Sequence, residues 1–441
     1  MARIASWLVG ACALATTVTA PAGAQTVTAT DGDIAVHGQA TLVVQGTPGF
    51  ASPYTGDNSL TPHQIKETVD LTLYAGARPW RGGELWIDPE VDQGFGLSNT
   101  LGVAGFPSAE AYKVGRKRPY LRLQRLFFRQ TIGLGGGSDA VEGAANQFAG
   151  TRDRDRLVVT AGKFGVGDVF DTNVYAHDPR SDFLNWSAVD AGSFDYAADA
   201  WGYASGIAVE SYRAAWTLRL GAFNLSTVPN GETLETRFQQ YQLDAEIEHR
   251  HRIAGRDGAV RVTLFRNRGR FGRYDEALAY AAANGTDVDP APVRRRLTRT
   301  GASVNAEQAV TDTLGLFARA GVADGSIEPY DFTDIDRTVQ AGLALRGQRW
   351  RRPADTIGAA VIVNGISDAH QRYLDAGGLG VLVGDGRLPH PGAEYIGEAY
   401  YKLAAMPGVE LTLDYQCIAN PGYNRDRGPA HVFGLRAHGA F

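Results

Sequence analysis

The stretch GELWIDPEV, residues 83–91, alternates between two kinds of side chain. An extended chain has two faces, and here one carries Leu85, Ile87 and Val91 and the other carries Glu84, Trp86, Asp88 and Glu90. In a soluble sheet the apolar face packs on a core and the polar face meets bulk water. A large tryptophan among three carboxylates fits such a water-facing surface poorly. The stretch therefore predicts a strand, and the rest of the chain has to show which face is wet.

The same alternation recurs along the whole chain, in about sixteen segments. They lie near 34–45, 67–78, 84–91, 120–132, 156–165, 199–211, 215–224, 239–251, 259–268, 297–309, 313–321, 337–347, 356–364, 394–405, 409–418 and 431–441. Their polar positions repeatedly hold Asp, Glu and Arg, which are costly inside an ordinary apolar core.

The connections between these segments alternate between short and long. Long ones are expected near 46–66, 92–119, 166–198, 269–296 and 365–393, while 133–155 is a glycine-rich link on the side where short turns are expected. Strands of roughly ten residues, with long loops on one rim and turns on the other, are typical of a transmembrane β-barrel. Closure also satisfies every backbone group in lipid. The sequence predicts an all-β, antiparallel barrel of about sixteen strands, with long extracellular loops and short periplasmic turns.

A soluble, secreted all-β protein such as a β-helix or a propeller is the alternative fold. Such folds show internal repeats, and no fixed repeat period is visible in this chain. In a barrel the apolar face meets lipid and the polar face lines the lumen. Leu85 and Ile87 are then expected outside and Trp86 inside. Pro89 cannot donate to the strand ladder, so the strand is expected to end near it.

The amino-terminal residues predict export. Arg3 precedes an apolar run from about Leu8 to Val18, and the small residues Ala22 and Ala24 frame a cleavage site. This pattern is a secretory signal peptide over residues 1–24, which leaves 25–441 as one barrel domain. The formal net charge is −5 and no basic stripe is visible, so nucleic acid is not an expected partner.

Several motifs resemble the carbohydrate-selective porins of the OprB family, and together they span nearly the whole exported chain. They are GGELW (82–86), GFGLSNTLGVAGFP (94–107), AYKVG (111–115), RLFFRQT (125–131), GKF (162–164), FDTN (170–173), YAHDPR (175–180), FLNW (183–186), NGIS (364–367) and NPGYNRDRGP (420–429). The resemblance implies a sixteen-stranded porin of the bacterial outer membrane that takes up monosaccharides such as glucose.

Loop 166–198 is the candidate for an inward constriction. It is the third long loop, and by analogy with many sixteen-stranded porins, in which the third loop folds into the lumen, it is expected to do the same. A long loop without regular structure is also usually functional. Its candidate residues for the solute path are Asp171, Asn173, Asp178, Arg180 and Trp186. A solvated external loop rich in turn residues is the alternative.

The barrel wall offers charges of both signs. Arg125 and Arg129 share one face of the segment 120–132, and the lumen is favoured because an arginine facing lipid near midplane costs roughly 2–4 kcal/mol. With Glu84, Trp86 and Asp88 they are expected to line the path, although the arginines could serve only to neutralise buried carboxylates. A porin needs several weak sites rather than one deep well.

Three functions remain open at this stage. The first is carbohydrate-selective diffusion, and the second is a general or anion-leaning porin that filters with Arg125 and Arg129. The third, an outer-membrane barrel hydrolase, is disfavoured because no Ser motif accompanies the scattered histidines. No cofactor or metal is predicted.

The expected contacts are sugars, outer-membrane lipid and lipopolysaccharide, the last near 294–296. The carboxyl-terminal Phe441 resembles the signal read by the barrel assembly machinery. The oligomeric state is left open: a homo-oligomer is possible, since trimers are common among porins, but the sequence itself shows no trimer seam.

Overall fold

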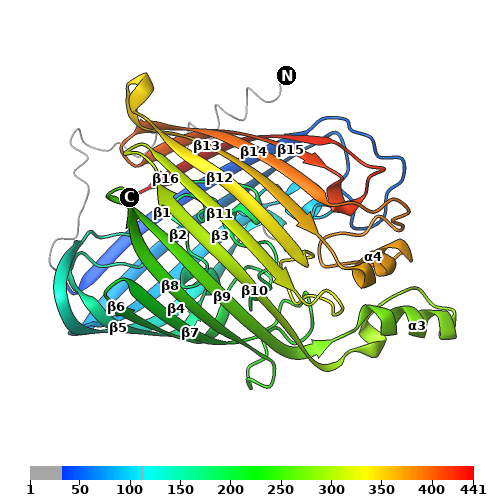
Figure 1. Ribbon diagram of the computed structural model, residues 1–441, viewed down its shortest axis with the longest axis horizontal. Coiled ribbons are helices and arrows are strands. Elements are labelled where there is room, and N and C mark those ends of the chain that lie inside the picture. The colour runs from blue at the N-terminus through cyan, green and yellow to red at the C-terminus, as the bar shows by residue number, and fades with distance from the viewer. Residues whose placement is uncertain (1–31, 112) are drawn as a thin grey trace.

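The computed structural model describes residues 32–111 and 113–441. The predicted signal peptide, residues 1–24, lies outside this part of the chain. Sixteen antiparallel strands form a closed barrel in which each strand pairs with its neighbours in sequence and β1 pairs with β16 (Figure 1). The predicted fold class is therefore confirmed.

The strands are β1 Ile34–Thr47, β2 Gln64–Trp80, β3 Gly83–Gly94, β4 Arg116–Val141, β5 Gly150–Phe164, β6 Ala204–Arg213, β7 Trp216–Asn224, β8 Tyr241–Ile253, β9 Arg256–Phe271, β10 Arg295–Ala309, β11 Leu314–Ala323, β12 Arg337–Gly347, β13 Arg352–Gly365, β14 Glu394–Met406, β15 Val409–Ala419 and β16 Ala430–Ala440. Each of the sixteen predicted segments coincides with one of them. The largest difference is in β4, which continues well beyond the predicted end at residue 132.

The two faces of the strands lie as expected for a barrel in lipid. On β3, Leu85 and Ile87 are 47% and 43% exposed on the outside, whereas Trp86 is fully buried inside. On β2, Leu71 and Leu73 are likewise exposed while Asp70 is buried. An apolar outer surface with a polar interior reverses the usual order of a soluble sheet, so the alternative of a soluble β-protein does not fit.

Long loops and short turns occupy opposite rims. The longest loop, 165–203, contains η2 Val166–Asp168 and α2 Trp186–Val189, and the other rim elements are η1 Leu97–Asn99, α3 Tyr274–Asn284, η3 Ala291–Val293, α4 Asp368–Asp375 and η5 Pro421–Tyr423. The turn-side element is η4 Gln348–Trp350. Figure 1 shows α3 and α4 at one end of the barrel and the carboxyl terminus at the other. No helix in the described ranges is long and apolar enough to cross a membrane. In outer-membrane barrels the short-turn rim faces the periplasm.

The expected end of a strand at Pro89 is wrong, because β3 continues to Gly94. The register with β4 shifts between Asp88 and Pro89, so that Asp88 opposes Arg125 and Pro89 opposes Leu123. Gln124 is therefore an extra residue in a β-bulge. The bulge accommodates a proline without an N–H group, and it turns Gln124 inward, where it is fully buried.

The glycine-rich link is shorter than predicted, because β4 extends to Val141 and β5 starts at Gly150. Gly135, Gly136 and Gly137 all have positive φ angles, and the register shifts on both sides of Gly135. These irregularities bend the hairpin, since glycine adopts such angles without a steric penalty. The connection 142–149 is thereby directed back toward the barrel, and we call it the strap.

The barrel closes at the carboxyl terminus. The backbone N–H of Gly38 donates to the Phe441 carbonyl and that of Phe441 donates to Gly38, both at 2.9 Å. A Cβ atom at residue 38 would lie 2.3 Å from the Phe441 ring. The missing side chain of Gly38 therefore makes room for the terminal aromatic ring.

Candidate functional site: a partly filled lumen

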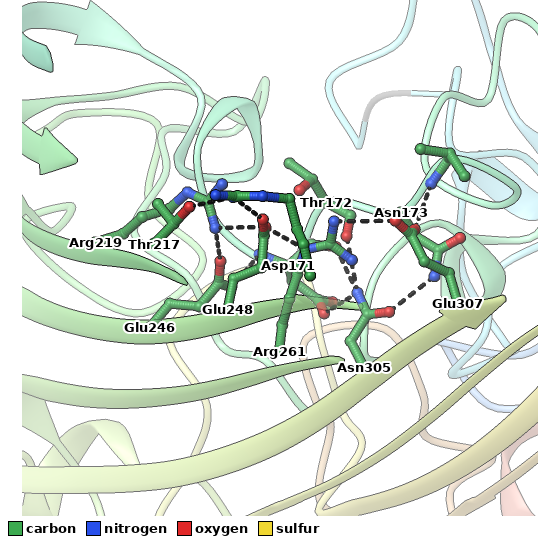
Figure 2. Close-up of polar contacts among 12 residues, drawn as sticks. Asp171, Thr172, Asn173, Thr217, Arg219, Glu246, Glu248, Arg261, Asn305 and Glu307 are labelled. Atoms are coloured by element: carbon green, nitrogen blue, oxygen red, sulfur yellow. Dashed lines mark hydrogen bonds and ion pairs between the residues drawn. The ribbon is translucent and has the colours of Figure 1, made fainter. Parts of the chain in front are cut away.

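Loop 165–203 folds into the barrel. Figure 2 shows how Asp171 and Asn173 attach it to the wall. The Asp171 N–H donates to Glu246 on β8 at 2.8 Å, and Asn305 on β10 donates to the Asp171 carboxylate at 2.7 Å. Asn173 donates to the side-chain oxygen of Asn305 at 2.8 Å. Asp171 and Asn173 are buried and anchor the loop. They were predicted to line the solute path, but in the structure they do not line the cavity.

The carboxylates that receive the loop are themselves held by arginines. Arg219 on β7 contacts Glu246 at 2.6 Å and Glu248 at 3.0 Å, and Arg261 on β9 bridges Glu248 and Glu307 at 3.0 and 3.1 Å (Figure 2). Alternating charges at these distances cancel much of the cost of burial. This network forms a rigid base for the loop.

Further anchors come from β11 and β16. Arg319 on β11 donates to the carbonyls of Ala188 and Ala176 at 2.8 and 2.7 Å, and its guanidinium lies 3.4 Å from the Asp171 carboxylate. Arg436 on β16 donates to the Pro179 and Asp182 carbonyls at 2.6 and 2.8 Å. The loop is thus attached to strands from β8 to β16.

The open space lies against the remaining wall. A cavity of about 1320 Å³ is bounded by residues of β1 to β7, by loop 165–203 and by the strap. Of the predicted path residues, Glu84, Arg125, Arg129, Asp178, Arg180 and Trp186 line it. The cavity thus lies on one side of the lumen, lined by charged, polar and aromatic side chains.

Arg180 projects from loop 165–203 into a cluster of acids. Its guanidinium lies 3.2 Å from Glu110, 3.6 Å from Asp70 and 3.6 Å from Glu90. Burial raises the pKa of Glu110 well above its ordinary range, and the charge of Arg180 opposes this shift. Asp178 accepts a 2.9 Å hydrogen bond from the Arg180 N–H, which fixes the turn that presents the arginine.

Arg125 and Arg129 face the lumen from β4, as predicted, and each meets an acid. Arg125 forms two parallel hydrogen bonds with Asp168, at 2.8 and 2.6 Å. Burial by itself raises the pKa of Asp168, but the Arg125 guanidinium outweighs it and holds this pKa below its usual value. Arg129 lies 3.4 Å from Glu84. The cavity wall therefore presents paired charges of both signs.

Loop 165–203 contributes part of the aromatic lining of the cavity. Trp186, at the start of α2, stacks on Phe106 with ring centroids 5.1 Å apart. Tyr196 lies 5.6 Å from Trp186, and Tyr203 lies beneath the Arg125 guanidinium at 4.9 Å. Trp186, Tyr196 and Tyr203 all line the cavity. These three side chains are 6%, 8% and 6% exposed, so only a small part of each ring borders the cavity beside the charged groups.

Trp86 faces the lumen, but the expectation that its ring is an accessible stacking surface is wrong. The strap covers it: Phe148 packs on Trp86 at 4.9 Å between centroids. The Trp86 Nε1–H donates to Glu84 at 3.0 Å. Trp86 is thus a packing surface for the strap, and its ring does not line the cavity.

Asp88 is also fully buried and holds the strap. The Asn146 side-chain amide donates to Asp88 at 2.8 Å, and Arg129 donates to the Asn146 carbonyl at 2.8 Å. Arg78 donates to the Ala149 carbonyl at 2.8 Å, and its guanidinium lies 4.3 Å from the centre of the Phe148 ring. The strap lines the cavity at the short-turn rim and narrows that mouth.

Sequence reasoning missed Glu110, Tyr203 and the strap. Glu110 lies in a second inward loop, and only the length of 92–119 hinted at its position. Tyr203 lies within a segment predicted as a strand, 199–211, whose first residues belong to the loop. The strap lies in the segment 133–155, which the sequence showed only as a long link on the side where short turns are expected. Each contact depends on where two distant segments meet, which periodicity does not encode.

His177 lines the cavity and has acceptors at both ring nitrogens. Nδ1 lies 3.3 Å from the Val189 carbonyl and 3.5 Å from Asp190, and Nε2 lies 3.1 Å from the Gly167 carbonyl. Burial alone would lower the pKa of His177, but Asp190 outweighs it and raises the pKa to about 9. Two facing acceptors suit an imidazolium, which donates from both nitrogens. His177 thus cross-links three parts of loop 165–203.

A closed barrel with an apolar exterior, an inward loop and a polar cavity defines a channel of the outer-membrane type. Residues 57–441 match the model of the carbohydrate-selective porin OprB family. The chain belongs to this family, and it is a carbohydrate-selective porin of the bacterial outer membrane. Family and fold are those of a channel rather than an enzyme.

Solved structures agree on the fold. The high-pH structure of Pseudomonas putida OprB superposes with a TM-score of 0.71 at 19% identity, covering 93% of this chain and 94% of that one. The low-pH structure of the same porin gives a TM-score of 0.51 at 15% identity, covering 93% of each chain. No curated protein sequence is significantly similar to the chain.

Proposed function

We propose that neutral monosaccharides diffuse passively through the cavity between loop 165–203 and the wall formed by β1 to β7. The constriction consists of Arg180 with Glu110, Arg125 with Asp168, and Arg129 with Glu84. The observation that carries this proposal is that each of these cations has a carboxylate within 3.4 Å.

Paired charges favour a neutral solute over either kind of ion. A free arginine would attract anions and a free carboxylate would attract cations, whereas a pair leaves a small net field and many hydrogen-bonding groups. Sugar hydroxyls both donate and accept, so they exchange contacts with guanidinium and carboxylate groups in turn. An anion-leaning filter built on Arg125 and Arg129 is less well supported, because Asp168 and Glu84 neutralise them.

The aromatic rings supply the second element of sugar recognition. Trp186, Tyr196 and Tyr203 line the same cavity as the charged pairs, so the small exposed part of each ring can contact the C–H face of a pyranose while the sugar hydroxyls reach charged groups. Several such contacts in sequence bind weakly, and weak binding at several sites lets a solute leave as readily as it enters.

Conductance in planar bilayers tests the proposal. We expect the wild-type channel to have a small conductance that glucose blocks at millimolar concentration. Arg180→Gln removes the cation beside Asp70, Glu90 and Glu110, so it should weaken the block and shift the ion preference toward cations. Arg346→Gln, at an exposed position near the short-turn rim, is the matched control. A large conductance indifferent to sugar, with a preference for anions, would contradict the proposal and favour the general porin.

The terminal Phe441 supports a further assignment. Its ring is 78% exposed and follows the last strand directly, so an assembly factor can reach it before β1 and β16 close. We infer that it is part of the signal for the barrel assembly machinery. Phe441→Ala should lower the yield of folded barrel in cells more than it lowers refolding in detergent; equal effects in both would contradict this role.

A further inference from the structure

The outward face of β9 changes abruptly from apolar to basic. Val260, Val262 and Leu264 are 37%, 38% and 53% exposed on the outside of the barrel. The next three positions of the same face are Arg266, Arg268 and Arg270. Their inward neighbours, such as Phe265 and Asn267, are buried, which confirms that the arginines point away from the lumen.

The neighbouring strands extend this basic surface. Arg270 pairs across the sheet with Arg296 on β10, and Arg268 pairs with Thr298. On the other side Arg268 pairs with Tyr241 of β8. Residues directly opposite one another in an antiparallel sheet have neighbouring side chains. We call Arg266, Arg268, Arg270 and Arg296 the basic ladder.

The basic ladder lies at the rim of the long loops. β9 ends at Phe271, directly before the segment that carries α3 (Figure 1). An outward arginine is costly at the centre of a bilayer and inexpensive at its surface. The apolar band that ends at Leu264 therefore places the basic ladder at the level of the headgroups of the outer leaflet.

The basic ladder differs from the other arginines nearby in its partners. Arg294 forms two hydrogen bonds with Glu328 at 2.8 Å, and Arg295 pairs with Glu276. Within residues 32–111 and 113–441, no ion pair with an acid is found for the four arginines of the basic ladder, and Arg296 donates only to the Gln239 amide oxygen, at 2.8 Å. Of the predicted rim arginines at 294–296, Arg294 and Arg295 are thus paired with acids, and Arg296 belongs to the basic ladder.

We propose that the basic ladder binds the phosphorylated sugar headgroup of lipopolysaccharide in the outer leaflet. The arginine fork matches phosphate oxygens in a two-point geometry, and four cations on adjacent positions complement a headgroup with more than one phosphate. Successive outward positions are about 7 Å apart along a strand, so the basic ladder contacts several anionic groups at once. The outward hydroxyl of Thr298 adds a group that hydrogen-bonds to sugar.

Binding of purified, detergent-solubilised protein to diphosphorylated lipid A, followed by native mass spectrometry, tests the proposal. Arg266→Gln/Arg268→Gln/Arg270→Gln should weaken binding about a hundredfold, at roughly a fivefold step for each of the three cations near a charged surface. The control changes three exposed arginines near the short-turn rim, Arg346→Gln/Arg349→Gln/Arg351→Gln, and should bind as wild type. Both variants should remain folded, which is measured by the shift of the barrel's band on a gel between unheated and heated samples.

Two further probes separate the sources of phosphate. Dephosphorylated lipid A should bind wild type as weakly as the basic-ladder variant does. If phosphatidylglycerol binds wild type as tightly as lipid A and loses as much on substitution, the site recognises anionic lipid in general and the proposal is overturned. Equal affinity of the basic-ladder variant and wild type for lipid A would also overturn it.

Discussion

Removal of the Phe148 ring should open the periplasmic mouth of the channel. The ring is 6% exposed and packs between Trp86 and the Arg78 guanidinium, at 4.9 and 4.3 Å from their centres. Truncation of a buried phenylalanine to alanine costs about 3–5 kcal/mol. At the lower end this corresponds to about a hundredfold change in the equilibrium between attached and released strap.

The remaining attachments make the effect graded. Asn146 still donates to Asp88 and Arg129 still donates to the Asn146 carbonyl, and hydrogen bonds to charged groups contribute about 1.5–3 kcal/mol each. Phe148→Ala should therefore raise the average conductance with frequent transitions between two levels. Phe148→Ala/Asn146→Ala should remain at the higher level.

Single-channel recording in planar bilayers, with and without glucose, measures both effects. The glucose concentration that gives half block should change far less than the conductance, because the pairs Arg180 with Glu110 and Arg125 with Asp168 do not contact the strap and only Arg129 does. Phe238→Ala, which removes a ring that is 46% exposed, is the control and should conduct as wild type. An unchanged conductance of Phe148→Ala with lower thermal stability would refute the reasoning, since the strap would then stabilise the barrel without limiting flow.

Three further predictions concern the loop and the seam of the barrel. Asn305→Leu removes the amide that donates to the Asp171 carboxylate, so the free energy of unfolding should fall by about 1.5–3 kcal/mol. The melting temperature should fall with it, and an unchanged melting temperature would contradict the anchoring role. His177 has a folded pKa of about 9, above its ordinary value of 6.5, so its stabilisation is complete below pH 6.5 and is lost as pH rises through 9. Thermal stability should therefore fall between pH 7 and 10 in wild type and fall less in His177→Gln, and equal slopes would refute the assignment. Gly38→Val places side-chain atoms where the Phe441 ring lies, so refolding yield should drop, whereas Gly38→Val/Phe441→Ala should recover part of it; no recovery would show that the ring is not the obstacle.

The sequence by itself determined the wall of this barrel. Alternation has the same period as the strand, so Leu85, Ile87 and Trp86 were assigned to the correct faces without knowledge of any contact. The number of strands and the side of the long loops followed from the same local signal. Arg125 and Arg129 were placed in the lumen for the same reason, since outward arginines within the apolar band are costly.

Only the tertiary structure decided which inward residues meet the solute. Trp86 and Asp88 share a face with Glu84, yet Phe148 and Asn146 arrive from a distant hairpin and cover them. Asp171 and Asn173 lie a few residues before Arg180 in one loop, yet Asn305 binds them to the wall while Arg180 reaches the cavity. Periodicity fixes the direction of a side chain relative to its own strand, whereas exposure depends on long-range packing between segments that the local pattern does not relate.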